Sequence, residues 1–283
     1  MEAAALLDRD ERVPKIFFPE GRTSYESLEI TSSVLGRTKR ISAGNGVIRL
    51  LEHDPVLLLR RIQTIQAYSK NRFFLGVGTG SPGRQPGKTI HSMLERVGEL
   101  KQGFESFPAG VAPPEIFVAT LKQSIAAKSA GKVDGLLLNF CSPQHATKLI
   151  GSLNPSETRN LELAIYLKIF YSSKKDGSAQ RLLLQEFLNY DSTPQYHAMF
   201  SEDRTALTIQ TLREREDWKH GQIEVPRELM RVSLANPDGA QLSEYVQSFR
   251  KSGISLPVVY PYFPDEEKSE FKIETVKDIL SSV

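Results

Sequence analysis

The feature that most constrains the fold is a regular alternation of short apolar runs and helical patterns along the whole chain. The apolar runs occupy residues 15–18, 40–48, 72–78, 115–120, 135–140, 163–171 and 256–263. Several of them, such as GLLLNF at 135–140, are continuously apolar, which is typical of parallel strands that helices cover on both faces. The sequence therefore predicts an α/β fold with a mainly parallel sheet.

The segments between these runs carry start and stop signals of helices. Asp54-Pro55 and Ser142-Pro143 each place a capping residue before a proline at the first helical position. Gly253 follows an amphipathic stretch, where a glycine commonly ends a helix. A longer helical insertion is expected at about residues 193–240, before the last strand.

Two architectures fit this alternation, a (β/α)8 barrel and an open doubly wound sheet. Seven strands are visible, and a barrel needs an eighth. Because residues 2–12 look like the end of a first helix, the missing first strand would precede Met1, and we expect the start of the gene to lie further upstream. No linker-like composition interrupts the chain, so residues 1–283 are expected to form one domain.

Composition narrows the class of protein. The 283 residues are 40% hydrophobic and 25% charged, as in ordinary globular proteins. A net charge of +2 argues against binding driven by electrostatic attraction to nucleic acid or membrane. Cys141 is the only cysteine, no run has the length of a membrane span, and the first residues do not resemble a signal peptide. We therefore expect a soluble cytoplasmic protein.

A glycine-rich stretch at residues 76–89 is close to two nucleotide-binding motifs but matches neither. A P-loop ending at Gly87-Lys88-Thr89 would need a glycine at position 82, which is Pro82. The dinucleotide pattern G-x-G-x-x-G would need a glycine at Ser81. These mismatches disfavour an NAD-dependent dehydrogenase on an open sheet.

The order and spacing of several short motifs resemble the bacterial luciferase-like flavin monooxygenases and deazaflavin-dependent oxidoreductases. The motifs are Arg37-Thr38, Gly44-Asn45-Gly46-Val47, His53-Asp54-Pro55 and Gly76-Val77-Gly78-Thr79-Gly80. Later blocks at residues 113–143 and 179–200 are similar to the same superfamily, which includes the methylenetetrahydromethanopterin reductases. No single motif is decisive, and the resemblance extends over nearly the whole chain from residue 13.

The resemblance implies a (β/α)8 barrel, here lacking its first strand, with an isoalloxazine-type ring at the carboxyl ends of the strands. It implies a non-prolyl cis bulge at Gly46-Val47 behind the ring, with the glycines at 76–80 leaving a slot for the ring and residues 81–87 forming the loop that follows. The expected cofactor-binding residues are Asn45, Gly46, Val47, Gly78, Thr79, Gly80, Thr120 and Asn139.

The catalytic group is less well defined by the sequence. Glu20 ends a strand where many relatives have an acidic residue followed by histidine, but here Gly21 follows it, so Glu20 is only a weak candidate. A solvated loop carboxylate is an equally good interpretation. His53 is expected to fix the turn into the next helix, and the other four histidines have no metal-ligand spacing, so no metal is expected.

These observations predict an oxidoreductase that transfers hydride between a 5-deazaflavin coenzyme (coenzyme F420), or alternatively FMN, and a small organic substrate. With FMN, a monooxygenase that uses reduced flavin and O2 is the expected activity. A catalytically silent flavin-binding barrel stays open as an alternative, because of the missing strand and the departures at Gly21 and Ser81. By analogy with the superfamily, a homodimer is expected.

Overall fold

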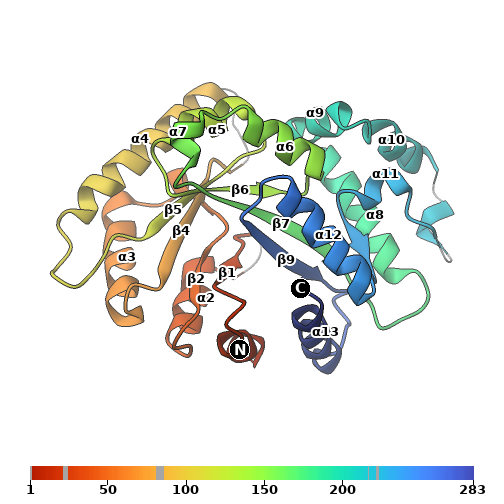
Figure 1. The fold of residues 1–283 in the computed structure, drawn as a ribbon, viewed down its shortest axis with the longest axis horizontal. Helices are drawn as coiled ribbons and strands as arrows, with labels where there is room; N and C mark the ends of the chain where they lie inside the picture. Colours follow the sequence, from red (N-terminus) through yellow and green to blue (C-terminus); the bar gives the residue numbers. More distant parts are fainter. Residues whose placement is uncertain (1, 22–24, 81–85, 216, 221–222) are drawn as a thin grey trace. The chain divides into compact units, whose positions relative to one another are not determined.

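The structure is a computed structural model that describes residues 2–21, 25–80, 86–215, 217–220 and 223–283 (Figure 1). The chain divides into two compact units, one formed by residues 1–137 and 153–162, the other by residues 138–152 and 163–283. Both units consist of parallel strands and helices, so the predicted α/β class is confirmed.

In the first unit, parallel strands pair in the order β1, β2, β4, β5 and β6, and β3 pairs with the end of β4. These strands are β1 (Lys15–Phe18), β2 (Ser42–Asn45), β3 (Ile48–Arg49), β4 (Phe73–Gly78), β5 (Glu115–Ala119) and β6 (Gly135–Asn139). The helices are α1 (Glu2–Arg9), α2 (Ser27–Leu35), η1 (Leu50–Glu52), α3 (Pro55–Ser69), α4 (Pro86–Phe104), α5 (Gln123–Ala130) and α7 (Pro155–Thr158).

Three phenylalanine rings, from Phe17, Phe74 and Phe117, pack against one another on one face of these strands, with centroids 4.5–5.5 Å apart. The rings explain two glycines in the strands. A Cβ on Gly44 would lie 2.1 Å from the carbonyl oxygen of Phe74 and 2.3 Å from its ring, and one on Gly135 would lie 2.3 Å from the Phe117 ring. The sheet can therefore hold large rings in this layer only because the neighbouring strands supply no side chain there.

A buried cation closes the amino-terminal ends of the same strands. The Lys15 ammonium at the start of β1 pairs with Glu115 at 2.6 Å and with Glu162, which lie at the starts of β5 and β7. It also lies 5.0 Å from the centroid of the Phe117 ring. The side chain of Lys15 is only 11% exposed, so this end of the strands is sealed by a paired charge.

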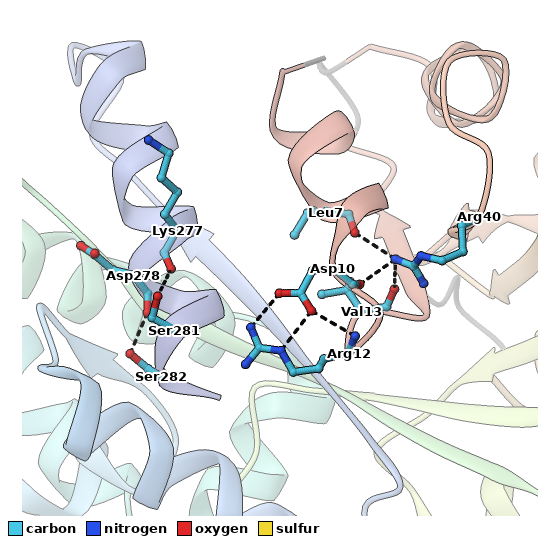
Figure 2. A network of polar contacts seen from close by, with 9 residues as sticks. All are labelled: Leu7, Asp10, Arg12, Val13, Arg40, Lys277, Asp278, Ser281 and Ser282. Carbon is cyan, nitrogen blue, oxygen red and sulfur yellow. Dashed lines mark hydrogen bonds and ion pairs between the residues drawn. The ribbon is translucent and has the colours of Figure 1, made fainter.

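Helix α1 is attached to the turn before β2 by a side-chain network (Figure 2). The Arg40 guanidinium donates to the carbonyl oxygens of Leu7, Asp10 and Val13 at 2.7–3.0 Å. In return, the Asp8 carboxylate accepts hydrogen bonds from the backbone N–H groups of residues 39–41, each at 2.9 Å. Arg40 thus bonds carbonyl groups at the end of α1 and in the segment that follows it, where a cation is favourable.

In the second unit, the last strand, β9 (Leu256–Tyr262), pairs in parallel with β7 (Glu162–Phe170) from Ala164 to Phe170. The short strand β8 (Leu234–Ala235) pairs only with Ile169 and Phe170. The helices are α6 (Pro143–Gly151), α8 (Ser178–Asp191), α9 (Pro194–Glu202), α10 (Ala206–Glu214), η2 (Asp217–Lys219), α11 (Arg227–Met230), α12 (Gly239–Lys251) and α13 (Ser269–Ser282).

Each of the seven predicted runs contains a strand, and the region 193–240 is largely helical as predicted. Three details differ. The run 40–48 is divided into β2 and β3 at Gly46, the two-residue strand β8 was not predicted, and α4 begins at Pro86 within the predicted loop. The side chains of Asp54 and Ser142 cap α3 and α6 as predicted. None of the described helices has the length and apolar character needed to cross a membrane.

Candidate cofactor site

The segment between β2 and β3 has the geometry that the resemblance implied. The peptide bond between Gly46 and Val47 is cis, which confirms the predicted bulge. The Gly46 N–H donates to the carbonyl oxygen of Phe18 at 2.9 Å, so the bulge is bonded to the end of β1. Beyond it, Ile48 and Arg49 pair with the carboxyl end of β4.

The glycines of β4 make room for this bulge. A Cβ on Gly76 would lie 1.9 Å from the carbonyl oxygen of Asn45, and one on Gly78 would lie 2.7 Å from Cγ2 of Val47. The two glycine segments are adjacent, as predicted, but the prediction that Gly76 and Gly78 leave an empty slot for a ring is wrong. The space beside both residues is filled by the bulge, because the strands approach too closely for any side chain.

Asn45 acts from behind the bulge. Its side chain is fully buried, and Nδ2 donates to Oγ of Ser27 in α2 at 3.0 Å. Its Oδ1 is buried and has no hydrogen-bond partner among the described residues. The Asn45 side chain therefore anchors the bulge to α2 and does not reach the surface, where a cofactor would contact it.

Around β3 and the carboxyl end of β4, the partly exposed residues are Val47 in the bulge, Arg49, Thr79 and Gly80. Gly80 has a φ of +69°, and a Cβ there would lie 2.8 Å from Cδ of Arg49. The Arg49 guanidinium lies 3.7 Å from the Glu52 carboxylate. Sequence reasoning missed Arg49, although a single charge directly after GNGVI at a strand end was a usable signal.

Glu20 joins the ends of two strands. Its Oε2 accepts the backbone N–H of Arg49 at 3.0 Å, and its Oε1 lies 3.7 Å from Nε2 of His53. The Glu20 side chain is 11% exposed. The Glu20 carboxylate thus connects the bulge region to the turn into α3. His53 lies in that turn, where it was expected to have a structural role. The candidacy of Glu20 as a catalytic group stays a prediction.

Thr120 follows β5 and closes a local turn. Its hydroxyl accepts the backbone N–H of Lys122 at 3.1 Å and lies 3.2 Å from the carbonyl oxygen of the same residue. The residue is buried, at 6% exposure. The Thr120 hydroxyl therefore already forms its hydrogen bonds within the protein.

Asn139, at the end of β6, belongs to a buried polar cluster in the second unit. Its amide lies 3.1 Å from the hydroxyl of Tyr190 in α8 and 2.6 Å from that of Tyr196 in α9. Lys168 of β7 donates to the Tyr190 hydroxyl at 2.7 Å, to the Tyr262 hydroxyl at 3.3 Å and to the Glu186 carboxylate.

Lys168 is unusual because it is almost fully buried, and a buried ammonium group is stable only when other groups pair with it. It is 3% exposed, and its charge is balanced by Glu186 and by the faces of the Tyr190 and Tyr262 rings, with centroids 4.2 and 4.9 Å away. Burial raises the pKa of Tyr262, so this hydroxyl stays protonated at neutral pH. The signal missed in the sequence was the single lysine inside the apolar run LAIYLKIFY.

Among the described residues, no group of three His, Cys, Asp or Glu side chains has the arrangement of a metal site. The polar groups at the carboxyl ends of the strands can instead form hydrogen bonds and ion pairs with an organic ligand.

Residues 14–100 match the family model of the luciferase-like monooxygenases, and no curated protein matches the sequence. The matched segment contains β1 to β4 with the cis bulge.

Solved structures share the fold at low identity. One is a coenzyme F420-dependent tetrahydromethanopterin reductase from Methanopyrus kandleri, with 13% identity, a TM-score of 0.70 and coverage of 100% of this chain and 94% of that one. Another is an F420-dependent secondary alcohol dehydrogenase solved with an F420–acetone adduct, with 13% identity, a TM-score of 0.71 and coverage of 100% and 92%. A third is the oxygenating constituent of 3,6-diketocamphane monooxygenase from Pseudomonas putida, solved with FMN, with 11% identity, a TM-score of 0.64 and coverage of 100% and 91%.

The resemblance seen in the sequence is therefore supported by the family model over residues 14–100, and the chain shares the fold of these solved structures over its whole length.

Proposed function

We propose that the chain is an oxidoreductase that binds coenzyme F420 at the carboxyl ends of its strands and transfers hydride between it and a small organic substrate. The observation that carries this proposal is the cis bulge at Gly46-Val47, braced by Gly76 and Gly78 inside the segment that matches the family model. Two of the similar solved structures are named as F420-dependent enzymes, which supports this choice of coenzyme over FMN.

The residues of the first unit fit a planar ring with an anionic tail. Val47 offers a partly exposed apolar group on a bulge that Asn45 and Glu20 hold from behind. Thr79 and Gly80 are partly exposed at the end of β4 and offer backbone groups, and Arg49 supplies a cation beside them. The ring, when bound, would supply the hydride acceptor or donor. The protein orients the reactants and excludes water.

A fluorescence titration of the purified protein with F420 and with FMN tests this proposal. We expect saturable binding of F420 that weakens about 10- to 150-fold in Arg49→Ala, because a charge-assisted contact contributes about 1.5–3 kcal/mol. The matched control is Arg37→Ala, which removes an exposed arginine from the loop between α2 and β2. Binding of neither compound would overturn the proposal, and equal losses in both variants would remove Arg49 from the site.

Preferential binding of FMN would instead indicate a monooxygenase, which O2 consumption with reduced FMN would then test. The structure offers one argument for the silent flavin-binding alternative: Oε2 of Glu20, the only acidic candidate that the sequence offered, already accepts the backbone N–H of Arg49, and its Oε1 lies 3.7 Å from Nε2 of His53. In that case the cofactor would bind and no turnover would follow with any acceptor.

We further propose a homodimer, which sedimentation of the purified protein would detect.

A further inference from the structure

The last strand of the second unit, β9, has a strand partner on one side only among the described residues. It pairs with β7 from Leu256 to Tyr262, and no described strand pairs with its other edge. All seven of its residues are partly exposed, and none of them is charged. An exposed, uncharged strand at the edge of a sheet is a template for pairing with a strand of another molecule. A protein with such an edge therefore needs a feature that prevents this pairing.

The hydrogen bonds to β7 decide which backbone groups of β9 face outward. The N–H of Tyr171, directly after β7, donates to the carbonyl oxygen of Tyr262 at 2.8 Å, so the backbone groups of Tyr262 face β7. In a parallel pair, the N–H and C=O groups of every second residue point to the same neighbour. The residues two, four and six positions before Tyr262 therefore also face β7. The backbone groups of the three residues between them, Pro257, Val259 and Pro261, face the other edge.

This alternation puts both prolines of β9 at outward positions. Proline has no N–H, so the outer edge offers three carbonyl oxygens but only one N–H, that of Val259. A strand that pairs with this edge, in either direction, needs hydrogen bonds from alternate residues and would find one donor in place of three. The pairing with β7 is unaffected, because its register continues through both prolines, opposite Ile165 and Ile169.

We propose that Pro257 and Pro261 close the outer edge of β9 to strand pairing, so that the sheet of the second unit ends at this strand. Without its prolines, the segment 256–262 would combine β-branched and aromatic residues, no charge and an exposed edge, the combination that favours aggregation. This closure does not depend on a bound cofactor. It also means that the proposed homodimer forms through a surface other than this edge.

Amide hydrogen exchange of the wild-type protein tests the open edge directly. The Val259 N–H faces outward, so it should exchange at least about tenfold faster than the N–H groups of Val258 and Tyr260, which face β7. Equal protection of the three amides would mean that an acceptor of another segment or molecule pairs with this edge, which would overturn the proposal.

The role of the prolines is tested by sedimentation of the double variant Pro257→Val/Pro261→Val, which restores two outward N–H groups. We expect this variant to form larger species than wild type as its concentration rises, and its Val259 amide to become protected in them. The matched control, Pro108→Val/Pro113→Val, makes the same two changes at exposed positions outside the helices and strands, and should sediment like wild type.

Two results would contradict this role of the prolines. One is a folded β9 variant that sediments like wild type at every concentration, and the other is equal association of the β9 variant and its control. If the β9 variant fails to fold, the exchange rate of the Val259 amide in the wild-type protein still decides whether the edge is open.

Discussion

At the scale of single residues, the glycines of β4 show how one pattern can have two physical causes. Gly76 and Gly78 were expected to leave room for a ligand, yet the atoms nearest to them belong to Asn45 and Val47. Glycine is needed because another part of the backbone approaches within contact distance. Gly76 and Gly78 therefore affect the site indirectly, because their lack of a side chain leaves room for the bulge at Gly46-Val47.

Gly76→Ala should displace the bulge. The new Cβ would meet the Asn45 carbonyl oxygen at 1.9 Å, and backbone cannot move away as a flexible side chain can, so we expect a loss of about 1–3 kcal/mol or more in the free energy of unfolding. Urea unfolding measures this loss. The control is Gly98→Ala in α4, where a Cβ would meet no atom within 4 Å beyond the nearby backbone of its own helix, and alanine should stabilise by up to about 1 kcal/mol. Equal stability of the two variants would contradict this account.

The buried Lys168 should be far more sensitive to a single substitution than to a paired one. Lys168→Met leaves the Glu186 carboxylate, 15% exposed, without its partner, and we expect a loss of about 3–5 kcal/mol in the free energy of unfolding. In Lys168→Met/Glu186→Gln much of that loss should be recovered. A double variant no more stable than the single one, in the same urea titration, would show that the ion pair is not the cause.

At the scale of elements, α1 is held by charge-assisted bonds as well as by its apolar face. Burial acts to raise the pKa of Asp8, but the backbone N–H groups of Ile41, Lys39 and Arg40 lower it, and the net result is a lowered pKa. The ionised carboxylate thus binds the turn before β2, while Arg40 donates to the carbonyl oxygens of Leu7 and Asp8 at the end of the helix.

The contribution of Asp8 to stability should depend on pH in the acid range. Because its pKa is lower in the folded state, this contribution is complete above the ordinary carboxyl pKa of about 4 and is lost as the pH falls through the lowered value. We expect Asp8→Asn to be less stable than wild type at pH 6 and to lose less stability between pH 5 and pH 2. Urea unfolding across this range measures the difference, with Asp265→Asn at an exposed position as control. Parallel pH profiles of wild type and Asp8→Asn would contradict the assignment.

At the scale of the whole molecule, the two ends of the strands in the first unit have different tasks. Lys15, Glu115 and Glu162 seal the amino-terminal ends, and the candidate site lies at the carboxyl ends, as is usual in barrels of parallel strands. The phenylalanine layer lies between them. Stability and binding should therefore be separable by substitution.

Lys15→Met should lower the free energy of unfolding by about 1–3 kcal/mol, since its partners are partly exposed and water screens part of the loss. Its affinity for the cofactor should stay at the wild-type value. Arg49→Ala should show the reverse behaviour, with reduced affinity and nearly unchanged stability. Thermal unfolding and fluorescence titration of the same two preparations provide the comparison, and a loss of both properties in both variants would refute the division of tasks.

The sequence by itself determined the order of the elements and the class of fold, because apolar runs, caps such as Asp54 and Ser142, and the spacing of family motifs are local properties. It also located the bulge at Gly46-Val47. Only the tertiary structure decided that Asn45 is turned into the protein, that Glu20 is bonded to Arg49, and that β9 pairs directly with β7. It alone brought Lys168 within reach of Glu186 and Tyr190. Each of these depends on contacts between residues far apart in the chain, and neither hydrophobic periodicity nor motif spacing contains information on which buried polar groups meet.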